Sequence, residues 1–297
     1  MEPNIAYYVD GITKGNYSVL ARAISMVEND NSMSLDILEQ VKISAEIPVI
    51  GFTGPPGAGK STLIRATVEN YVKKKKRVAV VAVDPSSPFN QGALLGDRIR
   101  LGALFNHPDV YIRSLSSRGA LGGLSYKTIE IVDLLRSSNF DAIILETVGV
   151  GQSEVDVIGL ADRVVVVLVP ESGDEIQHSK SGIMEIADLF VINKADRPGA
   201  DLFFSSLKKA LLQNNKNIGV LKTNAEEEVG THELFEWIES PLIIDREKAL
   251  LVMTERAWRL IIHKQVRAID KIALAKKLEE QNKEPDFNLY RFIAANY

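Results

Sequence analysis

The chain of 297 residues contains no cysteine, which excludes disulfide bonds and metal sites built from thiolates. It also lacks any apolar run long enough to cross a bilayer, since the most apolar stretch, 164–169, has the length of a buried strand. A formal net charge of −4 gives no general attraction to nucleic acid or to an anionic membrane. We therefore expect neither of these as a partner.

The sequence starts with Met1-Glu2-Pro3-Asn4, without the basic start and apolar core of a signal peptide. The absence of cysteine is compatible with a reducing compartment. Hydrophobic residues make up 45% of the sequence and charged residues 25%, which are ordinary values for a globular protein. Together these features predict a cytoplasmic protein with a sizeable core.

Apolar runs alternate with amphipathic segments from Ile47 onward. Most runs are followed by a segment that can form a crossover helix, so the pattern predicts an α/β fold with a doubly wound, mainly parallel sheet. In such sheets ligands bind at the carboxyl ends of the strands, so the residues directly after each run are the candidates for chemistry. The expected strands are 47–53, 78–84, 110–113, 141–146, 163–169, 188–193 and 218–223.

The stretch Gly54-Pro55-Pro56-Gly57-Ala58-Gly59-Lys60-Ser61 follows the first expected strand and opens a helical pattern at Thr62. Strand, glycine loop and helix in this order are typical of a phosphate-binding loop, because the glycines let backbone N–H groups surround a phosphate at the helix N-terminus. Lys60 can reach the β- and γ-phosphates, and the Ser61 hydroxyl can ligate Mg²⁺. The sequence therefore predicts a nucleotide-binding protein whose phosphate contacts come from 54–62.

Two acidic residues end strands that should lie beside this loop. Asp84 closes the second strand, where it could hold Mg²⁺-bound water or orient the attacking water. The alternative is a turn-forming aspartate before Pro85. Glu146 closes the fourth strand and is followed three positions later by Gly149, as in a Walker B and second-switch arrangement. Glu146 would then act on Mg²⁺ through water, and the Gly149 N–H would sense the γ-phosphate.

Val150 stands near the position where Ras-like GTPases place their water-orienting glutamine. We therefore expect intrinsic hydrolysis to be slow, with Gln152, Glu154 or a partner completing the site. Polar loops near the same sheet edge could respond to the γ-phosphate, among them 85–97. Arg118, in a further such loop, is interpreted as a surface arginine rather than a phosphate contact.

The sixth expected strand runs into Asn193-Lys194-Ala195-Asp196, an N-K-x-D pattern. Asp196 can accept from both the N1–H and the 2-amino group of guanine, a donor pair that adenine lacks. The Lys194 stem would pack on the base while Asn193 braces the loop. Thr223-Asn224-Ala225, after the seventh strand, stands where a third base-contacting loop is expected. The combination of these motifs with the phosphate-binding loop predicts GTP and GDP as the ligands.

Helical patterns on both sides divide the chain into an N-terminal extension, 1–45, a P-loop GTPase domain, 46–240, and a C-terminal helical region, 241–297. In the C-terminal region, 245–281 could form one long helix, which exceeds the usual globular range. Its apolar stripe needs a partner surface, either in a second copy or in a helical hairpin folded on its own domain. The stripe contains Leu251, Trp258, Ile262, Val266, Ile269 and Ala273.

Two further segments are rich in charged or polar residues. The basic run 73–77 is expected to be a solvated face between a helix and a strand. The segment 170–180, after the fifth strand, is polar and contains glycine; it is either an extra mobile loop or a plain strand-to-helix connection.

Taken together, the motifs resemble those of the methylmalonyl-CoA mutase-associated GTPases, the MeaB/ArgK/MMAA family of P-loop GTPases. The stretch Glu146-Thr147-Val148-Gly149-Val150-Gly151-Gln152-Ser153-Glu154 is the most specific carrier of the resemblance. One departure is visible, because Asn90-Gln91-Gly92 stands where members commonly have Thr-Gly-Gly, and the threonine hydroxyl is missing. The other matching segments are 20–28, 54–62, 83–87, 95–97, 121–123, 182–188 and 193–196.

The resemblance implies a GTPase that escorts an adenosylcobalamin-dependent acyl-CoA mutase, gating cofactor loading and protecting or reactivating the enzyme. It also implies a homodimer made through the C-terminal helices. By the matching motifs, the catalytic, nucleotide and magnesium residues are Lys60, Asp84, Asp97 and Glu146. The segment 171–180 falls where the family has a third switch that communicates with the mutase. The residues of interest there are Asp174, Gln177 and Lys180.

Two other functions compete with this one. A small-molecule kinase would need an acceptor pocket and a dedicated base beside the γ-phosphate, and no such constellation stands out. A metallochaperone GTPase of the nickel-delivery type would need metal ligands, but the chain has no cysteine and only four scattered histidines.

Overall fold

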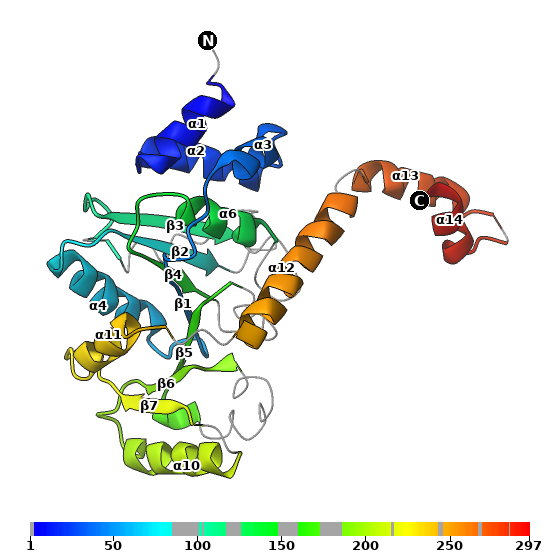
Figure 1. Cartoon of the computed structure of the whole chain (residues 1–297). Coiled ribbons are helices and arrows are strands. Elements are labelled where there is room, and N and C mark those ends of the chain that lie inside the picture. Colours follow the sequence, from blue (N-terminus) through cyan, green and yellow to red (C-terminus); the bar gives the residue numbers. More distant parts are fainter. Residues whose placement is uncertain are drawn as a thin grey trace. The chain divides into compact units, whose positions relative to one another are not determined.

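The structure of the chain is a computed structural model, which describes residues 3–84, 101–102, 104–116, 126–147, 160–172, 186–214, 217–242, 246–266, 269–284 and 286–297. One parallel sheet with the strand order β3-β2-β4-β1-β5-β6-β7 organises the fold (Figure 1). The predicted fold class is confirmed. The strands are β1 (Val49–Thr53), β2 (Val78–Asp84), β3 (Val110–Ser116), β4 (Ala142–Glu146), β5 (Arg163–Leu168), β6 (Leu189–Ile192) and β7 (Gly219–Lys222).

Every expected apolar run contains or begins a strand, and β3 continues to Ser116, beyond its expected end. The described α-helices are α1 (Ile5–Thr13), α2 (Tyr17–Glu28), α3 (Met33–Gln40), α4 (Lys60–Lys73), α6 (Tyr126–Arg136), α10 (Ala200–Gln213), α11 (Thr231–Glu239), α12 (Arg246–Val266), α13 (Lys271–Gln281) and α14 (Leu289–Asn296). A short 3₁₀ helix, η2 (Pro170–Ser172), follows β5.

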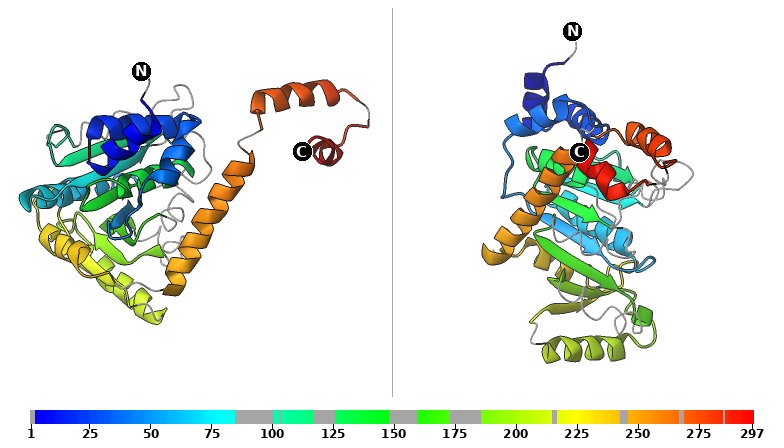
Figure 2. Two further views of the ribbon diagram at one scale, coloured as in Figure 1. Left: turned by 45° about the horizontal axis from the view of Figure 1, so that its top comes forward. Right: turned by 90° about the vertical axis from the view of Figure 1, so that its right-hand side faces the viewer.

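The core lies where α4 and α11 pack against each other and against the sheet (Figures 1 and 2). Strand β1 lies between β4 and β5, and its residues are buried throughout. Alternate β1 side chains, Ile50 and Phe52, belong to the same apolar cluster as Tyr71 of α4 and Phe235 of α11. Their burial fixes the register of the central strands, which in turn places the carboxyl ends of β1, β4 and β5 next to one another.

The N-terminal helices α1, α2 and α3 pack against one another, and α2 and α3 also pack against α6. The expected apolar stripe on α2 is buried, and α1 adds a helix capped by Asn4. Charged contacts reinforce this packing, because Arg113 of β3 pairs with Glu28 at the end of α2. Lys127 of α6 pairs with Asp30 at 2.7 Å. The N-terminal extension is therefore fastened to the sheet by both apolar and ionic contacts.

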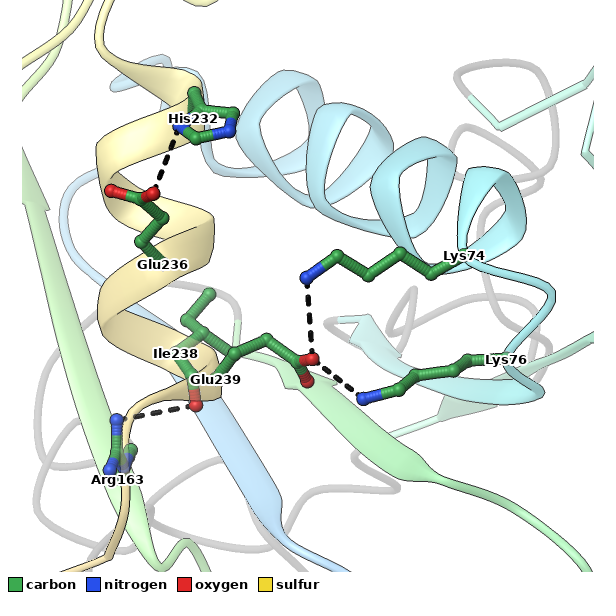
Figure 3. Close-up of polar contacts among 7 residues, drawn as sticks. All are labelled: Lys74, Lys76, Arg163, His232, Glu236, Ile238 and Glu239. Carbon is green, nitrogen blue, oxygen red and sulfur yellow. Dashed lines mark hydrogen bonds and ion pairs between the residues drawn. The ribbon is translucent and has the colours of Figure 1, made fainter.

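The basic run 73–77 is exposed at Lys73, Lys74 and Lys75, as expected of a solvated face, but it also makes specific contacts. Lys76 Nζ lies 2.6 Å from Glu239 Oε2, and Lys74 Nζ lies 3.6 Å from the same oxygen (Figure 3). Arg77 donates to the carbonyl oxygen of Gly15, and its guanidinium lies 4.9 Å from the ring centre of Tyr17. The sequence did not predict these contacts, because a run of like charges does not indicate which other segments supply its partners.

The C-terminal end of α11 is held from a second side by Arg163, the first residue of β5 (Figure 3). Its guanidinium is buried and donates to the carbonyl oxygens of Trp237 and Ile238 and, past the helix end, of Pro241. Burial lowers the pKa of Arg163, while the nearby carboxylate of Asp188 acts in the opposite direction. A cation at this position satisfies helix carbonyls that have no partner within the helix.

Replacing Glu239 by glutamine is expected to lower the free energy of unfolding at pH 7 by about 1 kcal/mol. Burial raises the pKa of Glu239, but the hydrogen bond and charge of Lys76, with Lys74 and Tyr71, outweigh it, so the net pKa is lowered. A lowered folded pKa contributes stability above the unfolded pKa, and this contribution is lost as the pH falls through the folded value. Urea denaturation of the wild type and E239Q should therefore converge below about pH 4.

The matched control for this prediction is Glu236→Gln on the same helix. Glu236 faces His232 at 3.6 Å, and both side chains are exposed (Figure 3). Its replacement should change the unfolding free energy by no more than about 0.3 kcal/mol. A stability difference between E239Q and the wild type that persists unchanged in acid would contradict the role given to the Glu239 carboxylate.

Two compact units divide the chain, Met1–Met253 and Thr254–Tyr297. The predicted single helix over 245–281 is wrong, because α12 ends at Val266 and α13 starts at Lys271. Asp270 caps α13, where its side chain accepts from the N–H of Ile272 at 2.8 Å. The apolar stripe continues in sequence across this break, so periodicity alone did not reveal the cap.

Candidate functional site

The loop between β1 and α4 has the backbone of a phosphate-binding loop. Gly54, Gly57 and Gly59 have φ values of 132°, 78° and 91°, which favour glycine. A Cβ at Gly54 would lie 2.0 Å from the carbonyl oxygen of Val167, and one at Gly59 would lie 2.2 Å from Asn193 Nδ2. The loop therefore requires glycine at these two positions both for its backbone conformation and for space.

Lys60 and Ser61 occupy the first turn of α4, and both side chains are buried. Lys60 Nζ donates to the carbonyl oxygens of Gly54 at 2.7 Å and Pro55 at 3.1 Å, so the side chain folds over the loop. Ser61 Oγ donates to Glu146 Oε1 at 2.7 Å. An ammonium group, a hydroxyl and a carboxylate thus meet at a helix N-terminus, which is a favourable place for an anion and its counter-cation.

The N-K-x-D segment after β6 is joined directly to the phosphate-binding loop. Asn193 is 2% exposed, and its Nδ2 donates to the carbonyl oxygen of Ala58 at 2.9 Å. Its Oδ1 accepts from Thr223 Oγ1 at 3.0 Å and from the N–H of Ala225 at 3.1 Å. One buried amide therefore joins the phosphate-binding loop, the N-K-x-D segment and the loop 223–225.

Lys194 adds a second connection, since its Nζ donates to the carbonyl oxygen of Gly57 at 2.9 Å. Its backbone has a φ of 56°, in the left-handed region, which turns the chain toward the exposed Asp196. The third loop is closed by a pair of backbone hydrogen bonds between Asn224 and Val229. The structure thus places the predicted base-binding residues together, on the same edge of the sheet as the phosphate-binding loop.

Beneath these groups, two threonines link the ends of β1 and β4. Thr147 follows Glu146, and its Oγ1 lies 3.0 Å from Thr53 Oγ1 and 3.3 Å from the carbonyl oxygen of Phe52. Neither threonine had been assigned a role, since Thr53 only precedes the phosphate-binding motif and Thr147 was counted only as part of the stretch 146–154. A second feature missed from the sequence is the ion pair between Arg197 and Glu171, at 2.9 Å.

Several predicted residues cannot be placed. The backbone of Asp84 ends β2, but its side chain lies outside the described residues. The same holds for every atom of Arg118, of the substituted first-switch positions 90–92, and of Gln152 and Glu154. The remaining predicted site residues outside the described part are Asp97, Gly149, Asp174, Gln177 and Lys180.

Comparison with known proteins places this site in a family. The model of the methylmalonyl Co-A mutase-associated GTPase MeaB family matches residues 20–276. The chain belongs to this family. It is therefore a GTPase and binds guanine nucleotide, as the paired phosphate and guanine motifs predicted.

Relatives of the chain carry GTPase names. A putative GTPase of Pyrococcus horikoshii is 41% identical over 287 residues, which cover 94% of this chain and 89% of that protein. The GTPase ArgK of Escherichia coli is 38% identical over 201 residues, 66% of this chain and 60% of the relative. The mouse mitochondrial methylmalonic aciduria type A homolog is 39% identical over 202 residues, 63% of this chain and 48% of the relative.

Solved structures agree on the fold. A crystal structure of a LAO/AO transport system kinase superposes with a TM-score of 0.69 at 23% identity, covering 96% of this chain and 95% of the other. The nickel complex of Helicobacter pylori HypB gives a TM-score of 0.52 at 18% identity, covering 73% and 92%. At these identities the likeness concerns the fold alone.

Among the described residues, no helix is long and apolar enough to span a membrane. Within the same part of the chain, no three His, Cys, Asp or Glu side chains gather in a way that could hold a metal ion.

Proposed function

We propose that this MeaB-family GTPase is a chaperone of an adenosylcobalamin-dependent acyl-CoA mutase, with methylmalonyl-CoA mutase as the first candidate. In this proposal it gates cofactor loading and protects or reactivates the mutase in the cytoplasm. The family match over 20–276 carries the proposal, since the family is named for its association with that mutase. The relationship to the methylmalonic aciduria type A homolog supports the same assignment.

The described residues fit GTP with Mg²⁺. A hydroxyl and a carboxylate, Ser61 and Glu146, lie 2.7 Å apart and buried beside the phosphate-binding loop, and hard oxygen ligands of this kind suit Mg²⁺. In the proposed arrangement Ser61 holds the ion directly, while Glu146, Asp84 and Asp97 act on it partly through water. When bound, Mg²⁺ would neutralise charge on the β- and γ-phosphates.

The remaining assignments concern the nucleotide itself. Lys60 would stabilise the β- and γ-phosphates with its ammonium group, and the loop glycines would keep the backbone N–H groups free to face them. Asp196 would select guanine, with Lys194 against the base and Asn193 holding the loops together. Further base contacts are assigned to 223–225, and phosphate contacts to 54–62.

GTP would change the surface that the mutase contacts. We assign γ-phosphate sensing to Gly149 and signalling to Asp174, Gln177 and Lys180. In this proposal 1–45 and 241–297 are helical regions flanking a GTPase domain, 46–240, and the C-terminal region forms a homodimer. A nucleotide produces such a switch only if the two states of the protein bind it with different affinity.

The test is association with a purified cobalamin-dependent methylmalonyl-CoA mutase, measured by analytical ultracentrifugation with GDP or with a non-hydrolysable GTP analogue. We expect a complex whose dissociation constant differs at least about fivefold between the two nucleotides, and a dimer of this chain at its centre. The absence of any complex in either state would refute the chaperone proposal and leave the GTPase assignment intact. Phosphate transfer from GTP to a small molecule, instead of release as free phosphate, would point to a kinase.

A further inference from the structure

The two threonines beneath the nucleotide site form a buried hydroxyl pair. Thr53 is 0% exposed and Thr147 is 2% exposed. Thr53 is the last residue of β1 and directly precedes Gly54, while Thr147 directly follows Glu146, the last residue of β4. The pair therefore links the two points at which the phosphate-binding loop and the acidic segment leave the sheet.

Three hydrogen bonds define this link. The N–H of Thr147 donates to the carbonyl oxygen of Phe52 at 3.1 Å, which continues the β1–β4 ladder one residue past Glu146. Thr147 Oγ1 lies within hydrogen-bonding distance of both that carbonyl oxygen and Thr53 Oγ1. Thr147 has a single hydroxyl proton, so when it donates to Phe52, the Thr53 hydroxyl can donate to Thr147 Oγ1. Both hydroxyls then have a partner in a place without water access.

From this geometry we propose that the Thr53–Thr147 pair is a positioning element for the Glu146 carboxylate. Glu146 reaches Ser61 at 2.7 Å, and Glu146 is the residue that directly precedes Thr147 in the chain. With the pair intact, the end of β4 cannot turn independently of the end of β1. The carboxylate is then held at the first turn of α4, where Ser61 stands.

The inference rests on the proposed Mg²⁺ role of Ser61 and Glu146. It predicts that removing the hydroxyl of Thr147 weakens the contribution of Mg²⁺ to nucleotide binding. A buried hydroxyl replaced by a methyl group of the same shape leaves the packing intact and removes the hydrogen bonds. Thr147→Val should therefore loosen the carboxylate while keeping the strand and the loop. The variant should release nucleotide faster than the wild type when Mg²⁺ is present. Without Mg²⁺ the two proteins should release it at similar rates.

The experiment measures the dissociation rate of a fluorescent GDP from the full chain, in excess Mg²⁺ and in EDTA. The ratio of the two rates reports the Mg²⁺ contribution without requiring any hydrolysis. For T147V we expect this ratio to fall about tenfold, with the rate in EDTA within about twofold of the wild type. T147S, which restores the hydroxyl, should recover most of the ratio. Because hydrolysis is expected to be slow, KM follows the affinity for the nucleotide with Mg²⁺, so T147V should raise KM for GTP.

Two further variants separate positioning from general stability. Thr67→Val is the matched control, since Thr67 of α4 is equally buried and its Oγ1 donates to the carbonyl oxygen of Leu63 at 2.9 Å. It should lower Tm to a similar degree and leave the Mg²⁺ ratio unchanged. T53V should lower the ratio about threefold, because Thr147 keeps its bond to Phe52. The T53V/T147V double variant should be no worse than T147V, since the same link is already broken.

The outcomes are distinct. If the wild type itself retains GDP equally well in Mg²⁺ and in EDTA, the proposed Mg²⁺ role of Ser61 and Glu146 fails, and the inference fails with it. If the wild type depends on Mg²⁺ but T147V shows the same ratio, or T67V lowers it equally, the positioning role alone is overturned. If T147V does not fold, T53V provides the same test, and an unchanged ratio in T53V overturns the inference.

Discussion

Asparagine in place of Asp196 is expected to weaken the binding of GDP about a hundredfold and to strengthen the binding of xanthosine diphosphate by a similar factor. The carboxylate can accept from both guanine donors, N1–H and the 2-amino group. An asparagine amide offers one acceptor and one donor, which match the N1–H and the C2 carbonyl of xanthine. The substitution has nearly the same shape, and Asp196 is exposed, so the loop should fold as before.

Isothermal titration with both diphosphates measures this exchange. Asp201→Asn is a suitable control, because Asp201 lies in the first turn of α10 and its side chain is 88% exposed. It pairs with Lys222, the residue that precedes the 223–225 loop. Its replacement should leave both affinities within about twofold. Equal affinity of D196N and the wild type for GDP would mean that guanine is selected elsewhere.

Methionine in place of Lys60 is expected to lower kcat/KM for GTP about a thousandfold. The ammonium group is buried at the N-terminus of α4, where its charge acts on the phosphates with little screening by water. Methionine fills a similar volume without a charge, so the effect should lie in nucleotide affinity and turnover, and the circular dichroism spectrum should remain that of the wild type.

Steady-state phosphate release and fluorescent GTP binding together measure this effect. Lys73→Met serves as the control on the same helix, since Lys73 lies in the last turn of α4 and is exposed. It should hydrolyse GTP at the wild-type rate. Retention of more than about a tenth of the activity by K60M would be incompatible with the role proposed for Lys60.

The sheet could be predicted from the sequence because its strands are short apolar runs with charged or glycine-containing ends. The apolar runs, the residues that end them and the helical segments between them all indicated the same parallel sheet. Sequence patterns are most informative when such signals agree. The phosphate and guanine motifs were placed correctly at one edge for the same reason, since parallel strands bring their carboxyl ends together.

What could not be predicted depends on partners that are distant in sequence. The basic run 73–77 finds Glu239 and Gly15, residues that no local pattern relates to it. At the start of α13 one side chain, Asp270, accepts from a backbone N–H within an otherwise helical pattern, and periodicity does not reveal such a cap. The Thr53–Thr147 pair could not be predicted either. Threonine is common in strands, and only the register between β1 and β4 shows that these two hydroxyls meet.

The hydrogen bonds of Asn193 join residues that are synthesised at different times, which affects when the nucleotide site can form during translation. The amide joins Ala58 to Ala225, segments that leave the ribosome at very different times. Strand β1 also has hydrogen-bond partners more than 90 positions downstream, because Phe52 is bonded to Thr147 and Val49 to Asp162. These bonds cannot form until the downstream residues have been synthesised. A nascent chain that stops before Asn193 therefore carries the complete phosphate-binding sequence without the amide that joins it to the other loops. We expect such a chain to bind GTP less tightly than the full protein.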